Sequence, residues 1–265
     1  MKKHALAAVI TASLLQTLSL AHAADEPPFA ADAELGVLLT SGNTESTALK
    51  GKLNLKQELE SWRTKYVLEA LYKEDQLEIV ENGVARTEEQ TTAEKYFASA
   101  QADYKLDNQY RSLFIFGSYE EDKFSGYDFQ ASIAAGFSDR LFQGTQSFFD
   151  YSVGPGISMS RTDEVRDANG VLVTDNIYDE SIMVRLAALY QYDFSDNAKF
   201  TQTFSSDVAL EDGANTKSKA ETALIANINQ SLAMKASFII THNSEVPEDR
   251  TSTDRQTALT LVYTF

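Results

Sequence analysis

The sequence predicts an all-β protein: a single antiparallel transmembrane β-barrel of about twelve strands, with both termini at its periplasmic end. Three observations support this prediction. Apolar and polar residues alternate with a period of two along most of the chain, the connections between alternating runs are short and long in turn, and the chain ends on an apolar strand at Phe265. These features are typical of barrels that cross a membrane with strands.

The alternation gives each predicted strand one apolar and one polar face. Many of the runs reach the ~9–11 residues that cross a bilayer when a strand is tilted. Strand counts of ten or fourteen stay open, because run boundaries are less certain than the runs themselves. The twelve runs are residues 33–40, 47–59, 62–74, 92–106, 110–120, 129–141, 147–162, 180–194, 199–210, 218–230, 234–241 and 251–265.

The connections predict which ends of the strands lie together. Five are short and six are long, and they alternate, as at the two ends of an outer-membrane barrel. Two long connections contain Asn82-Gly83 and Asn169-Gly170, which suit a type I′ hairpin turn. We interpret both as strand pairs that continue beyond the membrane, although two ordinary polar turns would also fit.

The first 23 residues have the three-part layout of a secretory signal peptide. Two lysines precede an apolar run from Ala5 to Leu20, and the small-x-small triplet Ala21-His22-Ala23 follows. The run is short and carries polar residues, which disfavours a membrane anchor. We therefore expect residues 1–23 to be removed and residues 24–265 to form the barrel in a bacterial outer membrane.

The two faces of the runs favour a membrane barrel over a soluble β-sandwich. Aromatic residues such as Trp62, Tyr72 and Tyr104 lie near run ends, where a bilayer interface would hold them. The polar faces mix charges of both signs with small residues, which suits a confined lumen. The charges predicted to face the lumen include Lys50, Lys52, Lys56, Arg63, Lys65, Glu69, Asp103, Asp150 and Arg185.

Acidic residues are concentrated in the long connections. The formal charge is −16, and it becomes −18 once Lys2 and Lys3 are removed with the signal peptide. Residues of the long connections and their flanks contribute −16 of that charge. This composition excludes nucleic acid as a partner, because phosphate binding needs a basic surface. Divalent cations could bridge these carboxylates to lipopolysaccharide and outer-membrane lipid, or the carboxylates could form a solvated acidic rim.

The sequence offers little material for catalysis. Cysteine is absent, and His242 is the one histidine that follows the predicted cleavage site. Its possible partners, Asp207 and Ser205, belong to a run two strands away. We therefore predict no enzymatic activity, no cofactor and no metal site. Gly154-Pro155-Gly156 lies within a strand and is interpreted as relieving crowding or bending the strand.

One segment resembles a known family. "AELGVLLTSGNTESTALKGKLNLKQELESWRTKYVLEALYKED" contains Ser41-Gly42-Asn43-Thr44, an alternating strand, a Trp-Arg pair and a second strand. With the terminal Phe strand, it is similar to the salt-induced outer-membrane protein family, catalogued as domain of unknown function 481. The resemblance implies an outer-membrane β-barrel with no established reaction, and it brings no catalytic or ligand residues.

Two classes of function stay open. The barrel could be a closed or narrowly permeable structural protein of the cell envelope, related to osmotic stress, with a lumen plugged by ion pairs. Alternatively, its lumen could be a small channel or transporter, for which the cations of the second and third runs would favour anions. We expect no catalytic chemistry in either case.

We predict that deleting Phe265 reduces assembly of the protein into the outer membrane, measured by fractionation. Leu259, Leu261, Tyr263 and Phe265 alternate along the closing strand and resemble the signal by which the barrel-assembly machinery recognises its clients. That machinery and periplasmic chaperones are the expected partners during biogenesis. Normal insertion of the truncated chain would leave the segment with a structural role alone.

Overall fold

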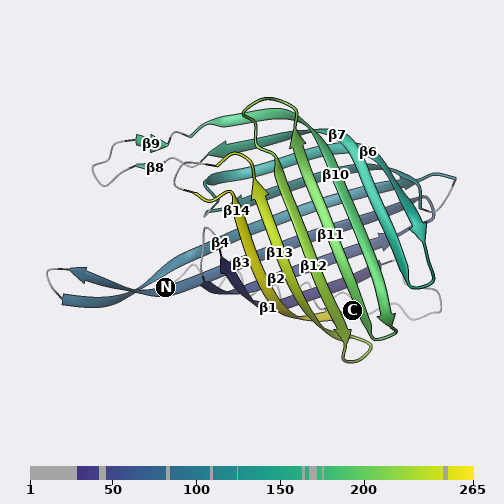
Figure 1. Cartoon of the computed structure of the whole chain (residues 1–265), viewed down its shortest axis with the longest axis horizontal. Helices are drawn as coiled ribbons and strands as arrows, with labels where there is room; N and C mark the ends of the chain where they lie inside the picture. The colour runs from purple at the N-terminus through teal and green to yellow at the C-terminus, as the bar shows by residue number, and fades with distance from the viewer. Residues whose placement is uncertain are drawn as a thin grey trace.

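Figure 1 shows the computed structural model, in which twelve strands form a closed antiparallel barrel. The structure describes residues 29–41, 46–81, 84–107, 110–123, 125–162, 165–166, 172–174, 176–246 and 250–265. Within these ranges, no helix is long and apolar enough to cross a membrane. The predicted signal peptide lies outside the described residues.

The barrel strands follow one another around the ring, and β1 pairs with both β2 and β14. A separate two-stranded sheet, β8 with β9, lies in the connection between β7 and β10. The strands are β1 (Phe29–Ser41), β2 (Ser46–Glu58), β3 (Trp62–Glu81), β4 (Val84–Lys105), β5 (Ser112–Asp122), β6 (Tyr127–Gln143), β7 (Ser147–Thr162), β8 (Val165–Arg166), β9 (Leu172–Thr174), β10 (Tyr178–Ser195), β11 (Ala198–Ala209), β12 (Lys217–Asn227), β13 (Leu232–Asn243) and β14 (Thr253–Thr264).

The predicted fold class is confirmed, and each predicted run corresponds to one barrel strand. The largest boundary difference concerns β3 and β4, which are 20 and 22 residues long. Beyond Tyr72 and Lys95, these strands pair with each other and no longer with β2 or β5. The hairpin therefore continues past its neighbours, as predicted, although the turn at residues 82–83 lies outside the described residues.

At the second predicted hairpin, two short strands also pair with each other. β8 and β9 pair on either side of the segment that contains Asn169-Gly170, and those two residues lie outside the described residues. Both hairpins leave the barrel at the same end, which we call the long-loop end. The opposite end carries the connections at residues 59–61, 106–111, 144–146, 196–197 and 228–231, and we call it the short-turn end.

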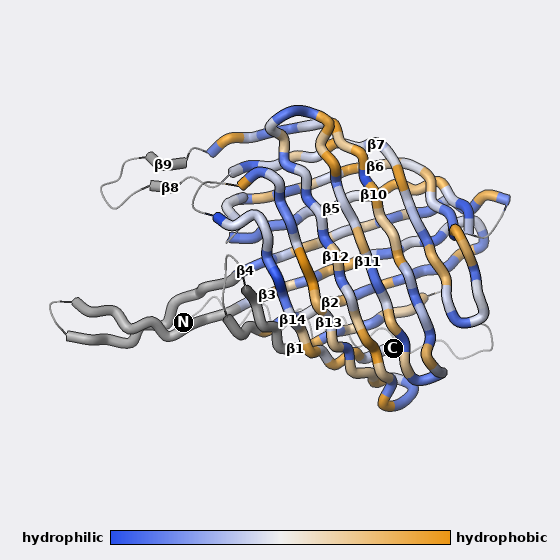
Figure 2. Tube along the Cα trace, in the orientation of Figure 1, coloured by the Kyte–Doolittle hydropathy of each residue, from blue (hydrophilic) through white to orange (hydrophobic). Residues whose placement is uncertain are grey.

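The outer face of the barrel is apolar although it is not covered by protein. Leu35 and Ile115 keep 61% and 62% of their surface exposed, and large apolar side chains recur at alternate positions on neighbouring strands. Figure 2 shows hydrophobic segments running along the strands between more hydrophilic ends. A wall of this kind would be unfavourable in water and is the outer surface that lipid requires.

The seam between β1 and β14 closes the ring. Leu35 lies opposite Leu261, and the backbone N–H of Phe265 donates a hydrogen bond of 3.0 Å to the carbonyl oxygen of Ala31. The last residue of the chain thus extends the pairing of the final strand. The four residues of the predicted assembly signal are exposed, and their role in assembly stays a prediction. They are Leu259, Leu261, Tyr263 and Phe265.

Glycines allow β6 and β7 to approach closely. A Cβ atom on Gly154 would lie 2.1 Å from the carbonyl oxygen of Ala135 and 2.6 Å from the Cα atom of Gly136. Real side chains do not tolerate such distances, and backbone atoms cannot move away without breaking the pairing. The interpretation of Gly154-Pro155-Gly156 as a segment that relieves crowding agrees with this geometry.

We predict that Gly154→Ala destabilises the folded barrel by about 3 kcal/mol or more, because the added methyl group overlaps backbone atoms of β6. The free energy of unfolding in lipid vesicles, followed by heat-modifiable gel migration, measures the effect. Gly51→Ala is the matched control, since its Cβ atom would meet nothing within 4 Å. Equal stability of the two variants would contradict the prediction.

Candidate functional site in the barrel lumen

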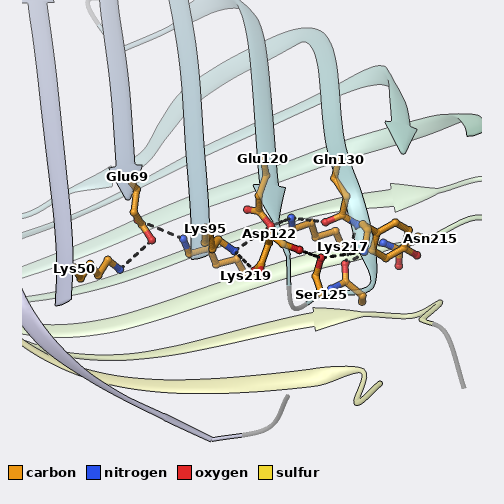
Figure 3. Close-up of polar contacts among 12 residues, drawn as sticks. Lys50, Glu69, Lys95, Glu120, Asp122, Ser125, Gln130, Asn215, Lys217 and Lys219 are labelled. Atoms are coloured by element: carbon orange, nitrogen blue, oxygen red, sulfur yellow. Dashed lines mark hydrogen bonds and ion pairs between the residues drawn. The ribbon is translucent and has the colours of Figure 1, made fainter. Parts of the chain in front are cut away.

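The most distinctive polar group in the lumen connects opposite walls of the barrel near the long-loop end. We call it the cross-lumen layer, and Figure 3 shows most of its members gathered inside the strands. Glu120 on β5 and Lys217 on β12 are separated by four strands along the shorter path around the ring. The layer consists of Lys95, Glu120, Asp122, Gln130, Asn215, Lys217 and Asn243.

Glu120 is the centre of the cross-lumen layer. Its carboxylate lies 2.5 Å from Nζ of Lys217 and 3.0 Å from Nζ of Lys95. Lys95 also lies 3.3 Å from Asp122. The side chains of Lys95 and Glu120 are almost entirely buried, so these charges depend on one another for stabilisation.

Amide side chains extend the layer across the lumen. Lys217 donates a hydrogen bond of 2.7 Å to Gln130 on β6, and Gln130 donates one of 3.3 Å to Asn243 on β13. Asn243 also accepts a hydrogen bond of 2.9 Å from Asn215. Nearby, the Tyr127 hydroxyl donates a hydrogen bond of 2.7 Å to the carbonyl oxygen of Glu245, which joins the β6 wall to the segment after β13.

A second set of contacts lies beside this layer, toward the middle of the barrel. Lys50 and Glu69 form an ion pair of 3.1 Å, and each side chain is only 6% exposed. Lys219 on β12 approaches Glu69 to 3.9 Å and lies 5.6 Å from the centre of the Phe97 ring. Glu69 therefore interacts with cations from two separate parts of the wall.

A third group links β1, β2, β12 and β13. Lys235 lies 2.7 Å from Glu221 and 3.1 Å from Glu34, and Asn54 donates a hydrogen bond of 3.2 Å to Glu34. All four residues are at least partly buried. Together, the three groups place cations and carboxylates in contact at several levels of the lumen, since Lys235 lies only three residues from the short-turn end of β13.

Apolar side chains fill another part of the lumen. Phe114, Phe116, Ala134 and Met183 form one buried cluster. Met183 lies over Gly156, since a Cβ atom there would come within 2.7 Å of the Met183 methyl group. The missing side chains on β7 thus give residues of β10 the space to reach β5.

The side chain of Arg185 also extends over the inner face of β7 toward β5. Its guanidinium lies 3.4 Å from the centre of the Phe116 ring and 2.6 Å from Asp207. In the strand register, Arg185 lies opposite Gly154. The predicted lumen charge Arg185 is therefore held by an aromatic ring on one side and a carboxylate on the other.

Charged pairs also lie near the short-turn end. Glu58 contacts Arg63 at 2.8 Å and Lys105 at 2.6 Å. The guanidinium of Arg140 makes two hydrogen bonds to Asp150, of 2.5 and 2.9 Å. This two-bond geometry orients Arg140 firmly.

Asp103 lies in the same half of the barrel, where it accepts hydrogen bonds from Gln101 and Ser112. The mouth at this end is hollowed by a pocket of about 380 Å³. Polar residues of β10, β11 and the adjacent turns line the pocket, among them Gln191, Asp193 and Lys199.

Three predicted lumen lysines differ from the others. Among the residues that the structure describes, no carboxylate lies within ion-pair distance of Lys52, Lys56 or Lys65. Lys56 and Lys65 are also exposed, whereas Lys50 is buried. We call Lys52, Lys56 and Lys65 the lysine cluster.

Sequence reasoning identified many lumen charges but missed the centre of the site. Glu120, Asp122 and Lys217 were counted with the acidic long connections, and the structure instead places them in the cross-lumen layer. Their runs alternate with period two, and the parity of Glu120 with Phe114 and Phe116 was the available signal. Nothing in the local pattern indicated which opposite strand would supply the partner.

The arrangement around His242 does not form a catalytic group. Its Nδ1 atom lies 2.9 Å from the Thr253 hydroxyl, whereas Asp207 is paired with Arg185 inside the lumen. In the described ranges, no group of three or more His, Asp or Glu side chains is placed to hold a metal ion. The absence of enzymatic activity and of a bound metal stays a prediction.

Comparisons of the sequence find a protein family and a relative, and neither has a described function. The family described as "Protein of unknown function, DUF481" matches residues 33–265. "Uncharacterized protein YdiY" of Escherichia coli (strain K12) is 27% identical over 244 residues, covering 92% of this chain and 86% of that protein.

Two solved barrels are similar in structure although their sequences are distant. The translocator domain of the autotransporter NalP from Neisseria meningitidis has a TM-score of 0.55 at 11% identity, covering 98% of this chain and 97% of that chain. The NanC porin has a TM-score of 0.51 at 10% identity, covering 87% and 98%. At these identities, the likeness concerns the outer-membrane barrel fold alone.

We predict that Glu120→Gln destabilises the barrel by about 3–5 kcal/mol, because it leaves the buried ammonium group of Lys95 and the half-buried one of Lys217 without their shared carboxylate. Glu58→Gln is the matched control, since Glu58 is 53% exposed and its pairs should contribute about 1 kcal/mol or less. Urea unfolding of protein refolded into lipid vesicles compares the two. A loss of similar size in both variants would show that burial of the pair is not decisive.

Proposed function

The chain belongs to the DUF481 family of proteins of unknown function, and we propose that it is an integral barrel of the bacterial outer membrane whose lumen is closed by ion pairs. The observation that carries this proposal is the contact of Glu120 with Lys217 from the opposite wall. Two walls that meet through buried charges leave no wide passage at that level. The resulting role is that of a closed or narrowly permeable structural protein of the envelope, of the osmotic-stress-related kind implied by the family resemblance.

The energetic argument for closure rests on burial. Opening the lumen at the cross-lumen layer would separate Glu120 from Lys217, which approaches it to 2.5 Å from the opposite wall, whereas Lys95 lies on the neighbouring strand β4. Separating charges that protein surrounds is costly unless water replaces each partner. The approach of Lys219 on β12 to Glu69 on β3, at 3.9 Å, adds a second contact across the lumen. The closed arrangement should therefore dominate in the absence of a ligand or partner.

A small anion-preferring channel is the second candidate function. The specific observation in its favour is the lysine cluster, which presents accessible positive charge inside the lumen. Rings or patches of cationic side chains favour anions in a pore. Under this alternative, the cross-lumen layer would be a constriction through which small solutes pass.

The outer surface of the barrel supports a location in a lipid bilayer. The exposed apolar wall fits a lipid environment, and the predicted signal peptide would direct export across the inner membrane. We propose that the barrel-assembly machinery inserts the chain and that the acidic long connections face outward, where divalent cations could link them to lipopolysaccharide.

We predict that the wild-type protein gives no stable conductance steps in planar bilayers, and that the triple variant Lys95→Ala, Glu120→Ala, Lys217→Ala gives stable anion-selective steps. The substitutions remove the ion pairs and their bulk from the cross-lumen layer and leave the lysine cluster in place. Single-channel current at high protein load measures the outcome.

The control is the triple variant Arg63→Ala, Glu58→Ala, Lys105→Ala. It removes the same number of cations and carboxylates from contacts near the short-turn end, so it should stay silent. Stable anion-selective steps from wild-type protein would overturn closure and support the channel. Silence of the Lys95, Glu120 and Lys217 variant, when it is folded, would show that this layer does not close the lumen.

A further inference from the structure

Two lysines face each other across β2 and β3 without an intervening carboxylate. Lys56 and Lys65 are direct partners in the antiparallel register. Directly opposite side chains on one face of a sheet have Cβ atoms about 4.5–5.5 Å apart, and like charges in these positions repel. Lys52 lies on the same face of β2. The positive charges of Lys52 and Lys56 both repel that of Lys65.

The carboxylates nearby are engaged by other groups. Lys52 has a carboxylate as its register partner on each side: Glu34 on β1, which contacts Lys235, and Glu69 on β3, which contacts Lys50 and Lys219. Glu221 contacts Lys235 at 2.7 Å, and Glu58 contacts Arg63 and Lys105.

Asp103 is the remaining carboxylate near Lys65. It accepts hydrogen bonds from Gln101 and Ser112, at 3.1 and 3.2 Å, and its register partner on β3 is Arg63. Lys52 thus has carboxylates beside it on both neighbouring strands, and the local excess of positive charge lies at Lys56 and Lys65.

The lysine cluster is accessible from the short-turn end. Lys56 lies two residues before the end of β2, and Lys65 lies three residues after the start of β3. Both side chains are exposed although their register positions face the lumen, and Thr203 on β11 is exposed as well. With the pocket at the same mouth, these observations describe a hollow, solvent-accessible half of the lumen.

We infer that the lysine cluster is a binding site for a small soluble anion that carries a phosphate or carboxylate group. Such a group would accept charge-assisted hydrogen bonds from Lys56 and Lys65 at once and would relieve their repulsion. The barrel wall separates the site from the bilayer, so a lipid headgroup within the membrane cannot reach it. The site lies away from the cross-lumen layer, and binding requires neither closure nor opening of that layer.

The test measures the temperature at which the folded, heat-modifiable form is lost, in phosphate and in chloride of equal ionic strength. Phosphate should raise this temperature for wild-type protein, because a ligand that binds the folded state stabilises it. Lys56→Gln should weaken the apparent affinity for phosphate by about tenfold, the loss expected for one charge-assisted contact. The double variant Lys56→Gln, Lys65→Gln should lose the phosphate effect.

A charge-reversal variant separates binding from general stability. Lys65→Glu places a carboxylate opposite Lys56, so it should raise the unfolding temperature in chloride and abolish the response to phosphate. Lys123→Gln is the control, since it removes a lysine from the turn between β5 and β6 at the other end of the barrel, and its phosphate response should match wild type.

Two results would overturn the site. One is a wild-type protein that responds equally to phosphate and chloride, and the other is a full phosphate response in the double variant. The triple variant of the cross-lumen layer distinguishes this inference from the proposed closure. If it keeps the phosphate response, the two regions act independently, whereas loss of the response in that variant would contradict the separate site.

Discussion

Closure of the sheet between β1 and β14 is the constraint on which the rest of the structure depends. Within the ring each strand is paired on both sides, whereas the part of the β3–β4 hairpin that extends past its neighbours is paired on one side. Closure also gives every strand an outer face and an inner face. Because the side chains alternate, the register that places Leu35 outside also places Glu34 inside, where Lys235 binds it.

A ring of twelve strands is narrow enough for long side chains from opposite walls to meet. This dimension explains why the lumen behaves as a protein interior in its long-loop half. Glu120 is buried there, and its charge is tolerated because two ammonium groups approach it. Glycines on β6 and β7 have the complementary role, since the absence of side chains allows Met183 and Arg185 to extend over the inner face of β7 toward β5.

Charged side chains near the two ends of the lumen differ in how they are paired and in how exposed they are. Near the long-loop end, the cross-lumen layer pairs cations with carboxylates, and Lys95 and Glu120 within it are buried. Near the short-turn end, Lys56 and Lys65 stay exposed and without a counter-ion among the described residues. A barrel that is closed at one level and basic at another can hold an anion without conducting it, which joins the proposed closure to the inferred binding site.

The sequence by itself determined the class of fold and the faces of the strands. Period-two alternation has a local physical cause, because successive side chains of a strand point to opposite sides whatever the strand pairs with. It therefore identified the barrel strands and placed Lys50 and Glu69 on one face, two residues that the register then holds at 3.1 Å. The predicted strand boundaries were less accurate for β3 and β4, which extend beyond β2 and β5. The length of that extension depends on pairing between the two strands themselves.

Only the tertiary structure decided which charges meet. Glu120 and Lys217 are 97 residues apart, and their contact depends on the tilt and register accumulated over all the strands between them. No local pattern carries that information, so the sequence placed both residues with the acidic connections. The same global geometry left Lys56 and Lys65 opposite each other while it brought cations to the carboxylates around them. Alternation sets the side of the wall on which a residue lies, and ring closure sets the residues it faces.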